Sequence, residues 1–377
     1  MTGSPDLPEV AIAHDYFVQD GGAERVAIEL ARLFPAAPVH TTFFVRGRFG
    51  ARIEPERVRA WRLAGLAPSP WFRPLLPAYM AHFSRLEVPA RRLVVSNSST
   101  FARAVTARAP ALHVAYVHSP LRFAWDVDAY LARSSFSAPA RIGLRGAAPL
   151  LRRWDRWAGR RADVLVTNSE HVQRRVRTAW RRDSTVIHPP VDVAGRRISA
   201  ERGDFYLVAA RLLAYKRVDL AVLACAILGR RLIVVGDGPE RARLERIAGP
   251  QTVFLGHVEQ RQVEELQGRA RALLVPAAED FGMAAVEVMG AGRPVVGYKA
   301  GGLLETVIDS KTGVLFDSPT ARGMAEAIER LESLVLDPAV ARRRALEFDV
   351  AAFRRRWKQL LEELGLGELL EADAAPA

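Results

Sequence analysis

The chain reads ALLVPAAEDFGMAAVE from Ala272 to Glu287. Its apolar beginning is typical of a buried strand, and Phe281-Gly282 would open a helix soon after that strand ends. Such a helix would direct its unpaired backbone amides, and the positive end of its dipole, toward whatever lies beside Glu279. Glu287 follows two turns into the helix, where it either reaches a neighbouring polar group or lies on the surface. This combination after a buried strand is uncommon by chance.

Strand-like apolar runs alternate with helix-like segments along the rest of the chain. Four runs lie in the first half, at Glu9–His14, Arg92–Val95, Ala111–Tyr116 and Val164–Val166. Five lie in the second half, at Phe205–Ala209, Arg231–Val235, Thr252–Leu255, Ala272–Val275 and Pro294–Val296. Helical stripes lie at Ala23–Leu33 and His171–Trp180. Strands that alternate with helices predict an α/β protein with two parallel sheets, each covered on both faces.

The length of 377 residues favours two domains. Residues 191–203 read VDVAGRRISAERG and look like a linker. We therefore expect one domain over residues 1–195 and another over residues 196–348. The segment 349–364 has the pattern of an amphipathic helix. One face of that helix would carry Phe353, Trp357, Leu360, Leu361 and Leu364.

Positive charge is concentrated in the first half of the chain. The net charge is +12, but residues 1–200 carry +14 and residues 201–377 carry −2. Such a basic body favours a polyanionic partner, whether nucleic acid, anionic lipid or a phosphorylated substrate. Codon bias toward arginine is an equally good explanation, because only four of the basic residues are lysines.

Cys225 is the single cysteine of the sequence. This excludes an internal disulfide framework, a cysteine-rich zinc site and an iron–sulfur cluster. The N-terminus lacks the basic and apolar regions of a signal peptide, and no apolar run approaches the roughly 18–20 residues that span a bilayer. We therefore expect a cytoplasmic protein.

Two further loops have the composition of anion-binding turns. Gly21 and Gly22 come at the start of the first helix, where glycine lets backbone amides approach an anion. Arg211 and Lys216 follow the first strand of the second series and suit a diphosphate. A structural turn in the first case, and structural salt bridges in the second, would explain the same residues.

These motifs together resemble the family 4 retaining glycosyltransferases of the GT-B fold. The resemblance covers nearly the whole chain and includes its C-terminal helix. It rests on Gly21-Gly22, His118-Ser-Pro, Arg211 with Lys216, Gly236-Asp-Gly-Pro239, Glu279-x7-Glu287, and Gly301-Gly302 with Glu305. In this order the set is highly specific for the superfamily, and poorly specific for the donor or the acceptor.

The resemblance implies two Rossmann-like parallel-sheet domains that face each other across a cleft. The N-terminal domain would bind the acceptor, residues 349–377 would return to pack on it, and the C-terminal domain would bind the nucleotide sugar. The enzyme would transfer a hexose such as mannose, with retention, from GDP-mannose or a UDP-sugar. It would need no cofactor or metal, because basic side chains and a helix N-terminus can stabilise the leaving diphosphate.

The resemblance also implies a role for each site residue. Glu279 would hydrogen-bond the transferred sugar, and His118 would contact it near the reaction centre. The donor diphosphate would be bound by Arg211, Lys216, Gly21 and Gly22. The rest of the donor would be bound by the amides of Phe281, Gly282 and Met283 and by Glu287, which would hold the ribose. The acceptor-side candidates are His14 and Asp15, which end the first strand.

Two other patterns are interpreted differently. Val234–Pro239 looks like a dinucleotide turn, but its GxGxxG pattern fails at Arg241. Asp126 and Asp128 form the Asp-x-Asp metal motif of the other large glycosyltransferase fold, yet they follow no nucleotide-binding strand series. We interpret these aspartates as a helix cap or as the rim of the acceptor site.

Two other function classes compete with a transferase. A sugar-nucleotide epimerase or hydrolase of the same fold would need acid–base pairs suited to proton abstraction, and the observed motifs suit transfer better. A basic nucleic-acid-binding protein would account for the charge. We expect no nucleic acid partner, however, because the sequence has no zinc finger or RNA-binding signature and no interleaved aromatic residues.

Aromatic residues stand beside arginines in the basic half, at Trp61-Arg62-Leu63, Trp71-Phe72-Arg73 and Trp154–Arg161. This mixture is favoured at membrane interfaces. We therefore expect an anionic membrane surface as a partner, at the inner face of the plasma membrane. The acceptor would then be lipid-linked, such as a polyprenyl-diphosphate sugar of a bacterial surface polysaccharide. The alternative is a soluble arginine-rich surface with the tryptophans in the core.

Overall fold

The computed structural model describes residues 7–61, 76–132, 136–199 and 201–370. The chain forms two compact units. The first consists of Met1–Asp128, Phe136–Pro190 and Phe353–Ala377, and the second consists of Ala129–Ser135 and Val191–Ala352. The segment Trp71-Phe72-Arg73, like Arg62 and Leu63, lies outside the described residues.

The first unit is built on a sheet of seven parallel strands in the order β3-β2-β1-β5-β7-β8-β9. Its strands are β1 (Val10–His14), β2 (Val39–Thr41), β3 (Val58–Ala60), β5 (Leu93–Ser98), β7 (Leu112–Val117), β8 (Val164–Thr167) and β9 (Thr185–Val186). A separate two-stranded sheet pairs β4 (Glu87–Val88) with β6 (Thr106–Ala107). The long buried strands were expected from the sequence. The short strands β2, β3 and β9 were not, because two or three residues show no period.

The helices of the N-terminal part are α1 (Gly22–Leu33), α2 (Arg46–Phe49), α3 (Leu76–Arg85), α4 (Arg122–Trp125), α5 (Val127–Ala132), α6 (Ala138–Gly159) and α7 (Glu170–Trp180). Short 3-10 turns lie at η1 (Pro55–Arg57) and η4 (Ala102–Ala104). Alternate residues of β1 enter two different cores. Ile12 packs into the core that contains α1, and Ala11 into the core that contains α3. The sheet is therefore covered on both faces, as its apolar strands require.

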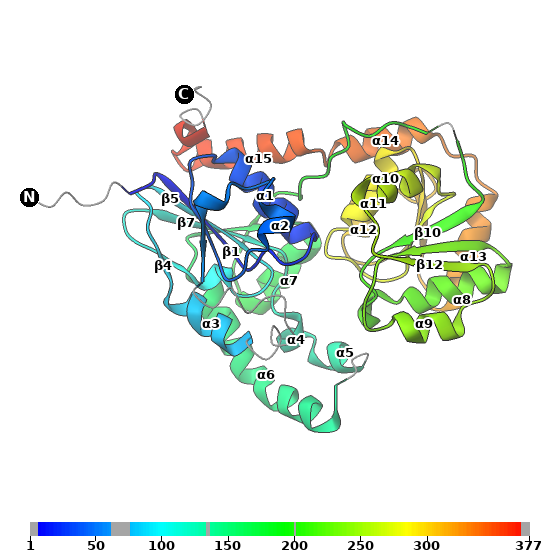
Figure 1. Ribbon diagram of the computed structural model, residues 1–377, viewed down its shortest axis with the longest axis horizontal. Coiled ribbons are helices and arrows are strands. Elements are labelled where there is room, and N and C mark those ends of the chain that lie inside the picture. Colours follow the sequence, from blue (N-terminus) through cyan, green and yellow to red (C-terminus); the bar gives the residue numbers. More distant parts are fainter. Residues whose placement is uncertain (1–6, 62–75, 133–135, 200, 371–377) are drawn as a thin grey trace, which may run out of the picture. The chain divides into compact units, whose positions relative to one another are not determined.

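The C-terminal helix α15 (Val350–Glu363) belongs to the core of the first unit. Phe353, Trp357, Leu360 and Leu361 are buried in the same cluster as the inner face of α1. The Trp357 ring stacks on Tyr116 of β7, with 6.4 Å between ring centroids. Figure 1 shows α15 lying beside α1, with the short turn η6 (Gly367–Leu370) after it.

The second unit contains a sheet of six parallel strands in the order β12-β11-β10-β13-β14-β15. Its strands are β10 (Phe205–Ala209), β11 (Arg231–Val235), β12 (Thr252–Gly256), β13 (Leu273–Val275), β14 (Val295–Tyr298) and β15 (Gly313–Phe316). Its helices are η5 (Ala214–Lys216), α8 (Val218–Leu228), α9 (Arg241–Ile247), α10 (Gln260–Arg269), α11 (Met283–Gly290), α12 (Leu303–Thr306), α13 (Ala321–Glu332) and α14 (Pro338–Leu346). Tyr206 and Leu207 of β10 enter opposite cores, so this sheet too is covered on both faces.

The expected linker is in part a packed segment of the second unit. Val191 and Val193 are buried in a core of that unit. The Asp349 carboxylate accepts hydrogen bonds from the amides of Val193, at 3.0 Å, and Ala194, at 2.9 Å. The first unit therefore ends at Pro190 rather than at residue 195, and the second continues to Ala352 rather than to residue 348. The segment after Pro190 and the segment around Asp349 are therefore bound to each other. The composition of residues 191–203 alone could not predict this contact.

Both large sheets have the same strand arrangement around their first strand. In each, the second and third main strands lie on one side of the first strand, and the later strands lie on the other side. The order therefore reverses between β1 and β5 in the first unit, and between β10 and β13 in the second. In open parallel sheets, ligands bind outside the carboxyl ends of the strands at such a reversal. The predicted fold class, with Rossmann-like parallel-sheet units, is confirmed.

Candidate functional site

Lys216 and Glu279 meet at the reversal point of the second sheet. Lys216 ends η5, after β10, and Glu279 follows β13. The Lys216 Nζ atom lies 2.7 Å from one Glu279 carboxylate oxygen and 2.6 Å from the other. Each side chain is about one-fifth exposed, at 20% and 19%. A charge-assisted contact of this length is strong, and its partial exposure leaves both groups accessible to a ligand.

Glycines bring the neighbouring loops against this pair. Gly301 has a φ of +70°, and a Cβ atom there would lie 2.2 Å from the Glu279 carbonyl oxygen. The Gly302 amide donates a hydrogen bond of 2.8 Å to that same oxygen. In the loop after β11, a Cβ atom at Gly236 would lie 2.0 Å from the Ala210 carbonyl oxygen. These glycines are required because only a bare backbone can approach so closely.

The helix after Glu279 begins two residues later than the sequence suggests. Gly282 is the N-cap of α11, with a φ of +95°, and Met283 is the first helical residue. Phe281 is buried, and its ring packs against Phe348 with 5.4 Å between centroids. The first-turn amides of α11 therefore face the side of the loop that carries Glu279, which makes this end of the helix suitable for an anion.

Arg211 lies two residues beyond β10, and its side chain is exposed. The structure brings Lys216 and Glu279 together, but within the described residues it shows no hydrogen bond or ion pair of the Arg211 guanidinium. This cation is available for a ligand, whereas Lys216 is already paired.

Glu287 is held inside the second unit and not on the helix surface. It is 5% exposed, and its carboxylate accepts a 2.7 Å hydrogen bond from the Gln267 side chain. Arg196 donates to the same Gln267 side chain at 2.6 Å and lies 4.0 Å from the Glu287 carboxylate. Gln267 and Arg196 were not among the predicted site residues. No spacing signal links them to Glu287, because they come from α10 and from the segment before β10.

Asn97 connects two histidines at the reversal point of the first sheet. It pairs in register with His14, and it is fully buried. Its amide nitrogen donates to the Ala23 carbonyl at 2.7 Å, and its amide oxygen lies 2.7 Å from His118 Nε2. Because a carbonyl can only accept, the amide orientation is defined and His118 Nε2 is the donor. Asn97 was not among the predicted site residues.

His14 is also buried, and its ring lies in contact with Asn97. The Asn97 amide nitrogen lies 3.0 Å from His14 Nδ1. Burial lowers the pKa of His14 below its ordinary value, so the ring is neutral at pH 7. Its Nε2 atom has no hydrogen-bond partner among the described residues.

Asp15 does not fit its expected place on the acceptor side. Its carboxylate is 2% exposed and accepts four backbone hydrogen bonds of 2.6–2.8 Å. The donors are the amides of Ser99, Thr100, Phe101 and Ala102. Asp15 therefore fastens the loop after β5 to the end of β1, and its oxygens are occupied.

The glycine loop of the first unit closes on a buried carboxyl group. Gly21 is the N-cap of α1, and its amide donates to the Glu24 side chain at 3.1 Å. Gly22 begins the helix. Glu24 is 2% exposed, and burial raises its pKa from 4.5 to about 8. The structure thus places an uncharged carboxyl group behind the two glycines at neutral pH.

The two aspartates of the Asp-x-Asp pattern bind different arginines. Asp126 pairs with Arg175 at 2.5 Å, and Asp128 pairs with Arg145 at 3.0 Å. Among the described residues there is no group of three histidine, cysteine or carboxylate side chains that could hold a metal ion. The aspartates are surface ion-pair partners.

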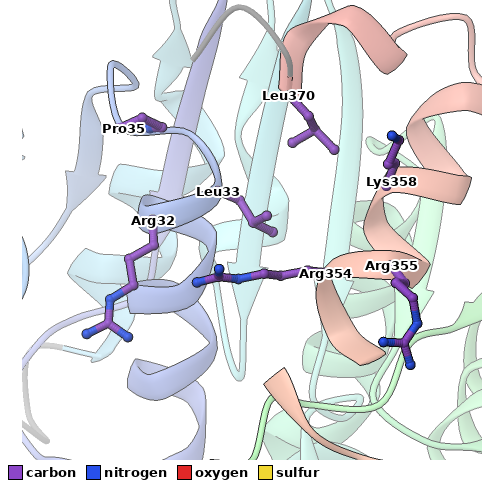
Figure 2. Close-up of a pocket in the computed structure, with 7 residues that line it drawn as sticks. All are labelled: Arg32, Leu33, Pro35, Arg354, Arg355, Lys358 and Leu370. Atoms are coloured by element: carbon purple, nitrogen blue, oxygen red, sulfur yellow. The ribbon is translucent and has the colours of Figure 1, made fainter. Parts of the chain in front are cut away.

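A pocket of about 380 Å³ lies where α1 meets α15 in the first unit. Its lining includes the cations Arg32, Arg354, Arg355 and Lys358. Figure 2 shows Arg354 extending from α15 toward α1, with Arg355 pointing away from it. Arg354 and Arg32 both pair with the buried Glu29, at 2.5 Å and 3.3 Å. Two of the four cations are therefore already paired with a carboxylate of α1.

Two of the three aromatic clusters expected at a membrane contain tryptophans that pack inward. The Trp154 indole donates to Ser84 at 3.1 Å and its ring meets Phe101 edge-on. Trp61 stacks on His82. Trp157, by contrast, is 40% exposed. None of the helices in the described part of the chain is long and apolar enough to cross a bilayer.

Comparison with known families gives a match over most of the chain. Residues 196–345 match the family described as Glycosyl transferases group 1, and residues 20–194 match Glycosyltransferase Family 4. The glycogen synthase of Mycobacterium tuberculosis is 32% identical over 208 residues, which are 50% of this chain and 49% of that protein. The D-inositol 3-phosphate glycosyltransferase of Nocardioides sp. is 27% identical over 210 residues, 45% of this chain and 46% of that protein. The matches thus span about half the length of these curated relatives.

Solved structures share the fold over almost the whole chain. Anabaena Alr3699/HepE in complex with UDP and glucose has a TM-score of 0.68 at 19% identity, over 94% of this chain and 99% of that one. The sucrose-phosphate synthase of Thermosynechococcus elongatus has a TM-score of 0.63 at 18% identity, over 95% of this chain and 99% of that one. At this level of identity the likeness concerns the fold.

Proposed function

Because the chain belongs to family 4 of the glycosyltransferases, we propose that it is a retaining enzyme that transfers a hexose from a nucleotide-diphosphate sugar to a glycan or lipid-linked acceptor. The observation that carries this proposal is the contact of Lys216 with Glu279 at the reversal point of the second sheet. A cation suits a diphosphate and a carboxylate suits sugar hydroxyls. A sugar nucleotide offers both groups within one molecule.

The second unit binds the donor in this proposal. Lys216, the exposed Arg211 and the first amides of α11 surround the position of the diphosphate. Glu279 accepts hydrogen bonds from hydroxyls of the transferred sugar, and Glu287 binds the ribose. Gln267 keeps the Glu287 carboxylate in place.

The chemical step breaks the bond between the anomeric carbon of the sugar and the diphosphate. Positive charge develops on the sugar as it passes through an oxocarbenium-like transition state, and negative charge develops on the leaving diphosphate. Lys216, Arg211 and the N-terminus of α11 stabilise that negative charge with groups already in position. This is why we propose a reaction that does not depend on a metal ion.

The first unit binds the acceptor in this proposal. His118 serves the reaction centre, with its Nε2 proton committed to Asn97. Gly22 offers its backbone amide at the N-terminus of α1 to the donor diphosphate. Gly21, whose own amide donates to Glu24, lets the diphosphate approach without a side chain in the way. His14 supports this arrangement from within, through Asn97.

A structural neighbour of this chain supports the class of the donor. Alr3699/HepE has been solved with UDP and with UDP-glucose, which supports a nucleotide sugar as the donor. We propose GDP-mannose or a UDP-sugar.

Thermal unfolding in the presence of nucleotide sugars tests the proposal. A donor at 100 times its dissociation constant adds about 2.7 kcal/mol to the stability of the protein. We expect protection by one nucleotide sugar and by its nucleoside diphosphate, from a panel that includes UDP-glucose and GDP-mannose. The protecting sugar nucleotide is then incubated with a lipid-linked glycan. Retained anomeric configuration in the product supports the proposal, whereas release of free sugar alone, or no protection by any donor, contradicts it.

A further inference from the structure

Helix α6 carries an exposed face that combines aliphatic side chains with arginines. We call the set Ile142, Leu150, Arg153, Trp157 and Arg160 the α6 face. Ile142 is 70% exposed and Leu150 is 71% exposed, and Trp157 and both arginines are exposed as well. At 3.6 residues per turn the five positions fall within an arc of roughly 80°. The buried residues of α6 lie on the opposite side, at Ala148, Asp155, Ala158 and Gly159.

The N-terminal half of α6 has little support from the first unit. Among its described residues 138–147, none is buried, and the first buried residue is Ala148. This half contains Gly143 and Gly146, each of which weakens a helix by about 1 kcal/mol relative to alanine, and Pro149 follows. Figure 1 shows these turns of α6 reaching past the sheet of the first unit. A helix this exposed gains stability from an external surface that covers its apolar side chains.

The charge of α6 indicates which surface that is. Five arginines lie on the helix, and its single acid, Asp155, is buried. Asp155 is bound by Arg103 and by the indole nitrogens of Trp125 and Trp180, so it contributes nothing to the exposed side. Arg161, just beyond the helix, packs over the Trp157 ring at 4.7 Å. Along the α6 face, exposed apolar side chains therefore alternate with arginines.

We propose that the α6 face binds the surface of a membrane that contains anionic lipid. Aliphatic side chains and a tryptophan enter the boundary between headgroups and acyl chains, and the arginines contact lipid phosphates. A second copy of the same cationic face would be repelled, and nucleic acid would leave the two aliphatic side chains in water. A lipid surface satisfies both parts of the face at once.

Vesicle flotation tests this proposal, and it requires neither donor nor acceptor, so its outcome is independent of the proposed reaction. The probes are phosphatidylcholine vesicles with and without phosphatidylglycerol, at low salt. We expect the full chain to float with the anionic vesicles and to be released by added salt. The double variant Ile142→Ser/Leu150→Ser should bind at least tenfold more weakly. Ile227→Ser/Val335→Ser removes two exposed aliphatic side chains of the second unit, and it should bind like the unchanged protein.

A second pair separates the charge from the apolar contact. Arg153→Gln/Arg160→Gln should lose binding to anionic vesicles by at least tenfold, since each basic residue near anionic lipid strengthens binding about fivefold. If the serine variant shows an altered melting curve, the Arg153→Gln/Arg160→Gln variant still tests whether the α6 face binds anionic lipid. Absence of flotation at low salt overturns the proposal. It is also overturned if both α6 variants bind as strongly as the unchanged protein, if the serine variant abolishes a dimer, or if the protein binds duplex DNA in preference to vesicles.

Discussion

Asn97 is the side chain on which both histidines of the first unit depend. Its amide joins His118, His14 and the Ala23 carbonyl within one buried cluster. A histidine held by a fixed partner keeps one tautomer and one orientation. The network explains how a residue after β7 and a residue at the end of β1 occupy defined positions.

Replacement of Asn97 should therefore lower activity as well as stability. Asn97→Ala removes the acceptor of His118, and each lost buried hydrogen bond costs about 1–3 kcal/mol. We expect a fall in kcat of tenfold or more with little change in the donor KM. Ser96→Ala is the matched control, because Ser96 lies next to Asn97 on β5. Its replacement breaks a 2.8 Å hydrogen bond to His113 and leaves His118 untouched. Equal loss of activity in both variants would assign Asn97 a purely structural role.

Glu279 is the residue whose change should separate folding from transfer. Glu279→Gln keeps the shape of the side chain but removes the charge that Lys216 contacts at 2.6 Å. Because interactions with charged groups at a reacting centre contribute about 3–4 kcal/mol, we expect transfer to fall by about 100-fold or more. Melting should change little. Glu332→Gln is the control, since Glu332 is also 19% exposed and pairs with Arg230 at 2.7 Å. Full transfer activity in Glu279→Gln would refute the assignment.

Glu24 should give the protein a pH-dependent stability. Burial raises the pKa of its carboxyl group from 4.5 to about 8. Between those values the folded state holds a proton that the unfolded chain has lost. Stability contributed by this proton is therefore present at low pH and falls as pH rises, by at most about 1.4 kcal/mol per pH unit.

Urea unfolding of the unchanged protein and of Glu24→Gln, at several pH values between 5 and 8, measures this effect. Glutamine does not titrate, so the variant should become more stable relative to the parent as pH rises. Parallel curves for the two proteins would show that Glu24 is charged in the folded state.

At the scale of elements, α15 shows how a helix at the end of the chain completes a core at its beginning. Trp357 is fully buried against Tyr116. Arg354 pairs with Glu29 of α1, so the helix is held by packing and by charge. The amphipathic pattern of this helix was visible in the sequence. Its partner was suggested there by family resemblance alone, because an apolar face does not say what covers it.

Loss of the Trp357 side chain should destabilise the first unit. Removing a buried tryptophan costs about 3–5 kcal/mol, so Trp357→Ala should lower the urea midpoint markedly. Trp157→Ala removes the same side chain from an exposed position and should change the midpoint little. Deletion of residues 349–377 should have at least the effect of Trp357→Ala. An unchanged midpoint in Trp357→Ala would mean that α15 contributes little to the core.

At the scale of the whole molecule, the proposed mechanism assigns the stabilisation of the leaving diphosphate to positively charged groups of the protein. Lys216, Arg211 and the N-terminus of α11 supply that charge in the second unit, although this half of the sequence is nearly neutral overall. We expect full transfer activity after treatment with EDTA. The measurement is product formation with and without chelator, followed by addition of Mn²⁺. Loss with EDTA and recovery with Mn²⁺ would contradict the proposed mechanism.

Much of this architecture can be predicted from local patterns in the chain. Apolar runs with flanking turns locate the buried strands, and the spacing from Glu279 to Glu287 locates the start of α11 to within two residues. These features can be predicted because the side-chain period of a helix or a strand repeats over consecutive residues. The same patterns miss the short strands β2, β3, β9 and β15.

Contacts between distant parts of the chain depend instead on strand order and register. Asn97 reaches His14 because β5 lies beside β1, and Glu287 reaches Gln267 because α10 and α11 pack together. Asp15 was predicted as a site residue, but its carboxylate accepts hydrogen bonds from four amides of the loop after β5. Local residue types indicate which side chains can take part in chemistry. Three-dimensional packing decides which of these side chains contact each other and which are bound to backbone amides of a loop. The reason is that each such contact joins residues far apart in the sequence, with no local spacing between them.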